Sequence, residues 1–387
     1  MLRIFIRLLA FTCMGMFTIA ATADDAPASG AVIRLANWNI QTLTVAGEKV
    51  FENQKPEDLR TEADFERLRA VRDAVGADVF VLQEISSLRA LAKVFPTSKW
   101  QLCFSGQYDA DAAGLAPYYE RQSISAIKPT CVVDADDAVL PDPLPGELRR
   151  QYLAFAIKKG TAASLRVIHD LPALSQPGED ANGDDTIVRG VRWGLEAVVN
   201  TPSGGLRILN VHLKSGCFDS YLTRMWWLNQ ANWAPNGLRD HACTTLARQL
   251  PVLRSWILDA KPGNLPFVMI GDFNRRIDVE DEDNTSPDFL PVLNGSATAD
   301  DNTDNSALTY LPEGPLSKKA CWPEDDGTEF EDAIEFMVFG PGDRPADWEA
   351  TYRKFLYSDI AAVGGRLTQA IDSPHLSDHC PSVITIH

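Results

Sequence analysis

The chain is predicted to form one α/β domain in which two packed β-sheets are flanked by helices. Apolar segments typical of strands alternate with amphipathic segments typical of helices along the sequence. Strand-forming segments lie on both sides of every long polar loop, and no loop reads as a linker between domains. The 387 residues are 45% hydrophobic, enough to bury a large core. We therefore expect a single domain, residues 24–387, behind an N-terminal segment.

That segment, residues 1–23, reads as a signal peptide. Arg3 and Arg7 precede an apolar run from Leu8 to Ala20, and small residues follow up to Ala23. The run is too short to span a bilayer comfortably, and no later stretch approaches the roughly 20 apolar residues that a span needs. We expect cleavage after Ala23 and a secreted or periplasmic, monomeric protein without a transmembrane segment.

Cysteine usage agrees with export. Cys13 leaves with the signal, and six cysteines remain, an even number suited to an oxidising compartment. Fifteen pairings are possible, and the alternative is that some cysteines stay as buried thiols. Our expectation pairs neighbours in the sequence: Cys103 with Cys131, Cys217 with Cys243, and Cys321 with Cys380.

Two segments carry the pattern of amphipathic helices that cover a sheet. In Thr61–Gly76 a capping pair, Thr61 with Asp64, precedes an apolar stripe, and the glycine ends the helix. Asp78–Glu84 follows as a buried strand. The second helix, Thr244–Leu258, contains Pro251, which we expect to kink it.

The charge balance bears on the substrate. The net charge is −17, and loss of Arg3 and Arg7 with the signal takes it to −19. A freely accessible polyanion would be repelled, although metal ions can bridge an acidic protein to a phosphate. Residues 277–317 hold ten acidic and no basic residues and read as a solvated loop. Arg275-Arg276 is a local exception: it directly follows the motif Asp272-Phe-Asn274 and would place positive charge where a phosphate held by that motif would sit.

Polar side chains stand at the ends of apolar strands at five places in the chain, four of them after a strand and one, Ser377-Asp-His379, before the C-terminal strand. Asp272 and Asn274, in Gly-Asp-Phe-Asn, project from one side of a strand end and could hold one water and one phosphate oxygen together. Alone, this motif could also be a polar turn. Five such strand ends in order are hard to ascribe to chance; the other four are Asn37-Trp-Asn39, Glu84, His212, and Ser377-Asp-His379.

These residue types suit the hydrolysis of a phosphodiester. The reaction needs charge neutralisation on the phosphate oxygens, an activated water and protonation of the leaving oxygen. Carboxylate and amide oxygens are suitable ligands for Mg²⁺, Mn²⁺ or Ca²⁺. Histidine exchanges a proton near neutral pH, which makes His212 and His379 the candidates for acid and base. Which of them is acid and which is base stays open.

Together these motifs resemble the endonuclease/exonuclease/phosphatase superfamily, also called deoxyribonuclease-I-like, from about Val32 to Ile386. The resemblance implies a four-layer α/β sandwich, with two mostly antiparallel sheets packed face to face, helices outside, and the site at one edge of the sheets. It also implies roles: Asn39 and Glu84 bind the divalent cation, with Glu84 the principal ligand; His212 is a catalytic histidine; Asp272 and Asn274 position water and phosphate; Asp378 is linked to the metal; and His379 is the second catalytic histidine.

One position departs from the family pattern. The superfamily places an aspartate where it can pair with the final histidine, and the aligned segment here offers Glu335. Glutamate is longer by one methylene, so we expect the contact with His379 to survive with a shifted backbone. Asp332 is the other candidate for this role.

Substrate choice is less well specified by the sequence. Arg189 and Arg192 could bind phosphate or form surface salt bridges, and Tyr152 could hydrogen-bond phosphate or pack. Three tryptophans at 226, 227 and 233 could stack bases, enter lipid headgroups or pack under a loop. We expect an exported metal-dependent phosphodiesterase, a nuclease acting on nucleic acid. A phospholipid or sphingomyelin phosphodiesterase is the alternative enzyme, and an inactive family member that binds a partner is the alternative of another class.

Overall fold

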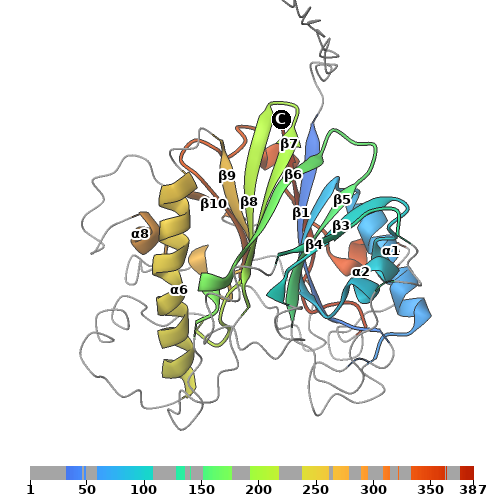
Figure 1. Cartoon of the computed structure of the whole chain (residues 1–387), viewed down its shortest axis with the longest axis horizontal. Coiled ribbons are helices and arrows are strands. Elements are labelled where there is room, and N and C mark those ends of the chain that lie inside the picture. The colour runs from blue at the N-terminus through green and yellow to red at the C-terminus, as the bar shows by residue number, and fades with distance from the viewer. Residues whose placement is uncertain are drawn as a thin grey trace, which may run out of the picture.

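Two β-sheets lie face to face in the computed structural model of the chain, with helices on both outer sides (Figure 1). The structure describes residues 32–45, 48, 59–107, 128–135, 140, 151–176, 192–217, 238–260, 265–278, 289–294, 308–313, 321, 333–361, 363 and 375–387. The predicted signal peptide and Arg189 lie outside these residues.

The first sheet has seven strands in the order β12-β13-β1-β2-β5-β3-β4. Its central pair, β1 and β2, is parallel, and its other neighbours are antiparallel. The strands are β1 (Ile33–Leu43), β2 (Val79–Ile85), β3 (Trp100–Phe104), β4 (Thr130–Val132), β5 (Tyr152–Lys158), β12 (Arg353–Lys354) and β13 (Ser382–Ile386).

The second sheet has six strands in the order β10-β11-β9-β8-β7-β6. It likewise has one parallel pair, β8 with β9, among antiparallel neighbours. The strands are β6 (Ser164–Leu171), β7 (Gly194–Thr201), β8 (Gly204–His212), β9 (Phe267–Asp272), β10 (Thr309–Leu311) and β11 (Glu335–Phe339). Both sheets are therefore mostly antiparallel, as predicted.

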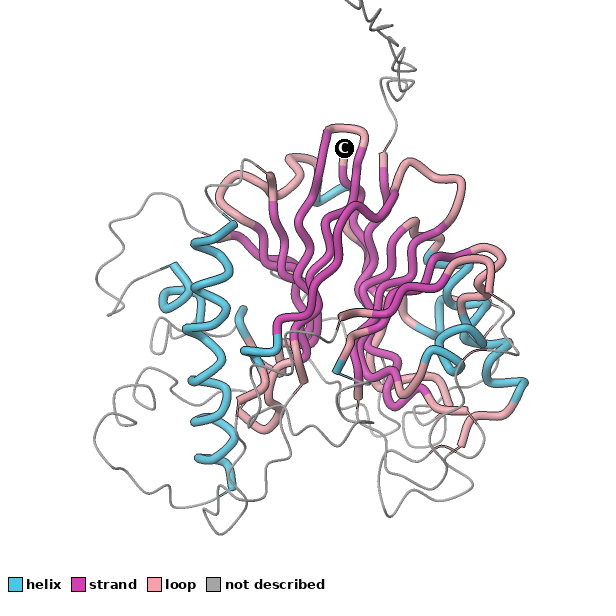
Figure 2. Tube along the Cα trace, in the orientation of Figure 1, coloured by secondary structure: helices cyan, strands magenta, loops and turns pink. Residues whose placement is uncertain are grey.

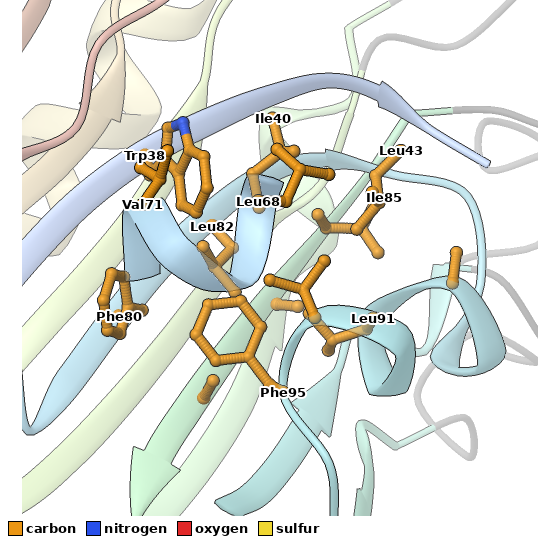
Figure 3. Packing of buried hydrophobic residues seen from close by; sticks show 14 of the residues in the cluster. Trp38, Ile40, Leu43, Leu68, Val71, Phe80, Leu82, Ile85, Leu91 and Phe95 are labelled. Atoms are coloured by element: carbon orange, nitrogen blue, oxygen red, sulfur yellow. The ribbon is translucent and has the colours of Figure 1, made fainter. Parts of the chain in front are cut away.

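Three apolar layers hold the sandwich together. Along β1, Leu35 belongs to the core between the sheets, whereas Ala36 and Trp38 face the helices, because successive side chains of a strand point to opposite faces. Leu68 and Val71 of α1 pack onto this outer face of the first sheet (Figure 3). A third cluster joins α6 and α8 to the second sheet. The predicted four-layer arrangement is confirmed.

The helices agree with the sequence pattern where capping signals were present. Thr61 caps α1 in a capping box with Asp64, and Gly76 ends it at a φ of 60°. The helix predicted over 244–258 extends further at both ends and contains Pro251. The apolar stripe begins only at Leu246, so it could not reveal the earlier start. The helices are α1 (Glu62–Val75), α2 (Leu88–Val94), η2 (Pro172–Leu174), α6 (Leu238–Ala260), α8 (Phe289–Asn294), α9 (Trp348–Thr351) and η5 (Tyr357–Asp359).

Three disulfides staple the fold, and their pairing is the predicted one: Cys103 with Cys131, Cys217 with Cys243, and Cys321 with Cys380. The first joins residues directly opposite each other on β3 and β4. Among the helices in the described ranges, none is long and apolar enough to cross a membrane.

Candidate active site

The candidate site lies where the parallel strand pair of each sheet ends. Asn39 and Glu84 come from β1 and β2, and His212 and Asp272 are the last residues of β8 and β9 and lie side by side in register. Because parallel strands end at the same edge, each pair delivers its polar residues to one place. The two sheets run next to each other in Figure 2, and a hydrogen bond of 3.1 Å from Asn39 Nδ2 to Asp272 Oδ2 shows that the two pairs meet across the sandwich.

The backbone is irregular at these strand ends. Three of the four non-glycine residues with positive φ in the described ranges are here: Thr42 at 48°, Glu84 at 62° and Asn274 at 51°. The register of β2 shifts against both of its neighbours around Glu84. Such irregularities redirect side chains and are common beside functional sites. They explain how Glu84, within an apolar strand, comes to face the other sheet.

Gly271 allows the strands of the second sheet to approach closely at this point. Its φ is 152°, and a Cβ added to it would lie 1.9 Å from the carbonyl oxygen of Val211. No side chain fits there. The glycine of the Gly-Asp-Phe-Asn motif therefore sets Asp272 tightly beside His212.

Asp272 is the centre of the cluster. Its Oδ2 accepts a hydrogen bond from Asn39 Nδ2 at 3.1 Å and lies 3.5 Å from His212 Nε2 and 3.8 Å from His379 Nε2. Its Oδ1 accepts from the backbone N–H of Asn274 at 2.8 Å. Burial raises the pKa of this carboxyl to about 7, against the opposing effect of His379. Asp272 can therefore exchange a proton near neutral pH.

Glu84 is held by three donors. It accepts hydrogen bonds from Asn39 Nδ2 at 3.2 Å, from the backbone N–H of Thr42 at 3.0 Å and from Gln151 Nε2. Its Oε1 lies 3.7 Å from His212 Nε2. One ligand atom each of Glu84, His212 and Asp272 falls within 4.8 Å of the others, so these three residues could hold a metal ion.

His379 pairs with the carboxylate that the sequence alignment offered. Its Nδ1 is hydrogen-bonded to Glu335 Oε1, and Glu335 lies directly opposite Asp272 across β11 and β9. Burial alone would lower the pKa of His379, but Glu335 and Asp378 together raise it well above its usual range. The pKa of Glu335 falls to about 2, because the neighbouring His379 outweighs the effect of burial. Asp332 lies outside the described residues.

His212 has the opposite environment. Its Nδ1 is buried without a hydrogen-bond partner among the described residues. Burial lowers its pKa well below the usual range, and Arg192 and His379 lower it further. The imidazole of His212 is therefore neutral at neutral pH, although it lies within 4 Å of the same aspartate as His379.

Asp378 directs a carboxylate oxygen toward His379 at the same edge. Its Oδ1 is buried without a hydrogen-bond partner in the described part of the chain, and it lies 3.4 Å from His379 Nε2. Burial raises its pKa despite His379, and the like charge of Glu84 raises it further. Carboxylates close enough to raise each other's pKa could share a divalent cation.

The predicted phosphate-binding residues are placed unequally. Arg192 lies close enough to Glu84 and Asp272 for their charges to raise its pKa, although burial lowers it overall, and it donates to Gln151 Oε1. Tyr152 is buried, and its ring centroid lies 5.4 Å from that of Phe104. Arg189 and the three clustered tryptophans lie outside the described residues.

Arg275 does not present an open cation, contrary to the interpretation of the Arg275-Arg276 pair. Its side chain is completely buried and donates from Nη1 to the carbonyl oxygen of Cys217 at 3.1 Å. It therefore supports the loop that carries the second disulfide.

Two residues of the site had no sequence signal that we recognised. Gln151 bridges Arg192 and Glu84. Arg60 is buried and donates to backbone carbonyls on both sides of the site edge, those of Ile40, Gln41, Thr42, His375 and Leu376. Arg60 thus ties the end of β1 to the segment that carries Asp378 and His379. Nothing in a lone arginine before a helix cap predicts this.

No family model matches the chain, and no curated protein matches it either. Solved structures do. The endonuclease/exonuclease/phosphatase from Bacteroides vulgatus shares 12% identity, with 92% of this chain and 99% of that chain covered and a TM-score of 0.43. The family protein from Bacteroides thetaiotaomicron shares 11%, with 92% and 94% covered and a TM-score of 0.45. ANGEL2, a 2′,3′-cyclic phosphatase, shares 12%, with 92% and 95% covered and a TM-score of 0.41.

Structures named for the superfamily that the motifs resemble are thus among those similar to this chain. Because the TM-scores are below 0.5, the functional conclusion rests on the chemistry of the site itself.

Proposed function

We propose that this chain is an exported, divalent-metal-dependent phosphodiesterase, and that its substrate is a nucleic acid. One observation carries the proposal. Asn39, His212 and His379, from three separate segments, converge on one oxygen of Asp272, with Glu84 beside them. The carboxyl of Asp272 has a pKa near neutral and lies between the neutral His212 and the protonated His379. The cluster can therefore supply both a general acid and a general base.

The donor set fits a hard divalent cation. Glu84 and Asp272 offer buried carboxylates, Asp378 offers an orphaned carboxylate oxygen beside them, and Asn39 is adjacent to the first two. We assign Glu84 as the principal ligand, with Asp378 and the side-chain oxygen of Asn39, which here accepts from the backbone N–H of Gln41 at 3.0 Å, completing the site. Bound Mg²⁺ or Mn²⁺, with Ca²⁺ as the third candidate, would neutralise charge on the phosphate oxygens.

The protein's own groups divide the proton transfers between them. Glu335 occupies Nδ1 of His379, which leaves Nε2 directed toward Asp272 and Asp378. From this position His379 would donate a proton to the leaving oxygen. Asp272 would accept a proton from the attacking water, with Asn274 fixing its other oxygen. His212 would hydrogen-bond a phosphate oxygen, and Arg192 would add positive charge on the same side.

The first test is hydrolysis of bis(4-nitrophenyl) phosphate with Mg²⁺, Mn²⁺ or Ca²⁺, with and without a chelator. Glu84→Gln should remove essentially all activity and leave the fold intact, because it removes the main anionic ligand without opening a cavity. Unchanged turnover of Glu84→Gln at saturating Mg²⁺ would defeat the metal assignment. Activity that persists in chelator would show that no metal is required.

DNA, RNA and sphingomyelin then decide the substrate class. Cleavage of DNA or RNA in preference to sphingomyelin supports a nuclease, and the reverse supports the phospholipid phosphodiesterase. No hydrolysis of any of them would favour the inactive binding protein. Export is tested by sequencing the N-terminus of protein recovered outside the cytoplasm, where we expect Asp24 as the first residue.

A further inference from the structure

Three buried amides cross the apolar space between the sheets, directly behind the site. We call Asn37, Gln83 and Asn210 the inter-sheet amide network. Gln83 Nε2 donates to Asn37 Oδ1 at 3.0 Å and to Asn210 Oδ1 at 2.8 Å. Asn37 Nδ2 in turn reaches the carbonyl oxygen of Gly271 at 3.5 Å. The network thus connects β1 and β2 of one sheet to β8 and β9 of the other.

These amides stand in an otherwise apolar core. Asn37 is 2% exposed, and Gln83 and Asn210 are 0% exposed. Their strand neighbours that enter the inter-sheet cluster are aliphatic, such as Val81 and Ile208. Burying an amide is costly unless it is hydrogen-bonded, and Gln83 Oε1 is buried without such a partner in the described part of the chain. Apolar residues of similar size would fill this space at lower cost, so stability does not explain the network.

The position of the network in the strands points to another role. Each member lies one or two residues before a residue of the site: Asn37 before Asn39, Gln83 before Glu84, and Asn210 before His212. Gly271, the acceptor of Asn37, directly precedes Asp272. A shift of any of these amides would therefore be passed along the strand to a catalytic or metal-binding side chain.

Asn210 also secures the irregular part of the first sheet from the opposite sheet. Its Nδ2 donates to the carbonyl oxygens of Leu82 at 2.9 Å and Ala154 at 3.1 Å. These two residues are partners on β2 and β5, at the point where their register shifts before Glu84. The conformation that turns Glu84 toward the site is thus held by a side chain two residues from His212.

We propose that the inter-sheet amide network positions the two halves of the site against each other, with Asn39 and Glu84 on one sheet and His212 and Asp272 on the other. The members are positioning residues, since their side chains bond to one another and to backbone carbonyls behind the site. The inference rests on the proposed function only for its activity readout, because metal affinity can be measured without substrate.

The test is the triple variant Asn37→Leu, Gln83→Met, Asn210→Leu, which keeps side-chain volume and removes all three amides together. We expect it to fold with a Tm close to that of the wild type: no half-satisfied amide remains, but the carbonyl oxygens of Leu82, Ala154 and Gly271 each lose a side-chain donor. Its affinity for Mn²⁺ or Mg²⁺ alone, measured by calorimetry, should fall by about 10- to 100-fold, the usual effect of removing groups behind metal ligands. Its kcat on bis(4-nitrophenyl) phosphate should fall by a similar factor.

Ile208→Val is the matched control. It removes one methyl group from the same inter-sheet core, two residues before Asn210, and should lower Tm without changing metal affinity or kcat. If the triple variant does not fold, Asn210→Leu alone serves, since it removes the contacts with Gln83, Leu82 and Ala154 in one change. Wild-type metal affinity in the network variant would overturn the proposal, as would an equal loss of affinity in Ile208→Val. An inactive wild-type protein would refute the proposed function but leave the affinity comparison valid.

Discussion

The two histidines of the site are the same residue type beside the same aspartate, yet their environments drive their pKa values apart. His379 has Glu335 on Nδ1, and the carboxylates around it outweigh burial, so its pKa rises. His212 has no hydrogen-bond partner on Nδ1 in the described ranges, and burial lowers its pKa. Both histidines turn Nε2 toward Asp272, so the contact made by Nδ1 decides which histidine carries a proton.

The two also differ in how they are held. His212 ends β8, and its backbone is fixed by the ladder with β9. His379 lies in the loop before β13 and is fixed by individual contacts. Ser377 Oγ donates to the carbonyl oxygen of Asn39 at 2.7 Å, and Tyr357 donates to the carbonyl oxygen of His379. One half of the site thus depends on secondary structure and the other on a few polar side chains.

Among the changes that test this comparison of the two histidines, the largest expected effect comes from removing either of them. His212→Ala and His379→Ala should each lower kcat by about 10²- to 10⁴-fold, the usual loss when an acid, base or charge-stabilising group is removed. His387→Ala is the control. His387 pairs with Asp347 at the protein surface, so this change should leave kcat unchanged. Steady-state kinetics on bis(4-nitrophenyl) phosphate would check this. If either site variant keeps near-normal kcat, that histidine is structural.

A smaller effect should come from Glu335→Gln, which acts on one histidine only. The pKa of His379 is raised by Glu335, so loss of this charge should lower that pKa and move the corresponding limb of the pH–rate profile to lower pH. We expect kcat to fall by about 10- to 100-fold at neutral pH, as for other groups that orient a functional imidazole.

Two further substitutions make this result specific. Glu196→Gln is the matched control, since Glu196 accepts from Arg207 and Trp256 in another ion pair, and its pH profile should be unchanged. Asp332→Asn should have little effect. A larger loss in Asp332→Asn than in Glu335→Gln would move the orienting role to Asp332.

The motifs that the sequence revealed are those set by local periodicity. Asp272, Asn274 and His212 follow apolar strands, and Thr61 with Asp64 forms a cap, so each could be found from its neighbours in the chain. The contact of Glu335 with His379 could also be predicted, because Glu335 aligns to the position where the superfamily has the aspartate that pairs with the final histidine.

What could not be predicted joins segments far apart in the sequence. Gln83 and Asn210 are polar residues inside apolar strands, which was a signal, but nothing in the sequence said that they meet. Alternation along β5 likewise does not tell which face of the first sheet the helices cover, so the sequence could not say on which face the buried Tyr152 lies. Arg60 gave no signal at all, since its five acceptors are backbone carbonyls, which any sequence supplies.

The smallest expected effect tests the difference in how the histidines are held. Arg60→Lys keeps the positive charge but loses the planar fork that reaches both the β1 end and the segment before Asp378. Lysine can replace only part of five hydrogen bonds of about 1 kcal/mol each, so unfolding free energy should fall by about 2 kcal/mol. Because the loop carrying His379 loosens while the β8 ladder stays intact, kcat should fall by less than about tenfold. Arg72→Lys, which disturbs a comparable buried contact to Val94 between α1 and α2, should cost stability with no change in kcat. Denaturant titration and steady-state kinetics of both variants separate a loss of stability from a loss of kcat. An equal loss of kcat in both variants would show that Arg60 supports the fold as a whole rather than the position of His379.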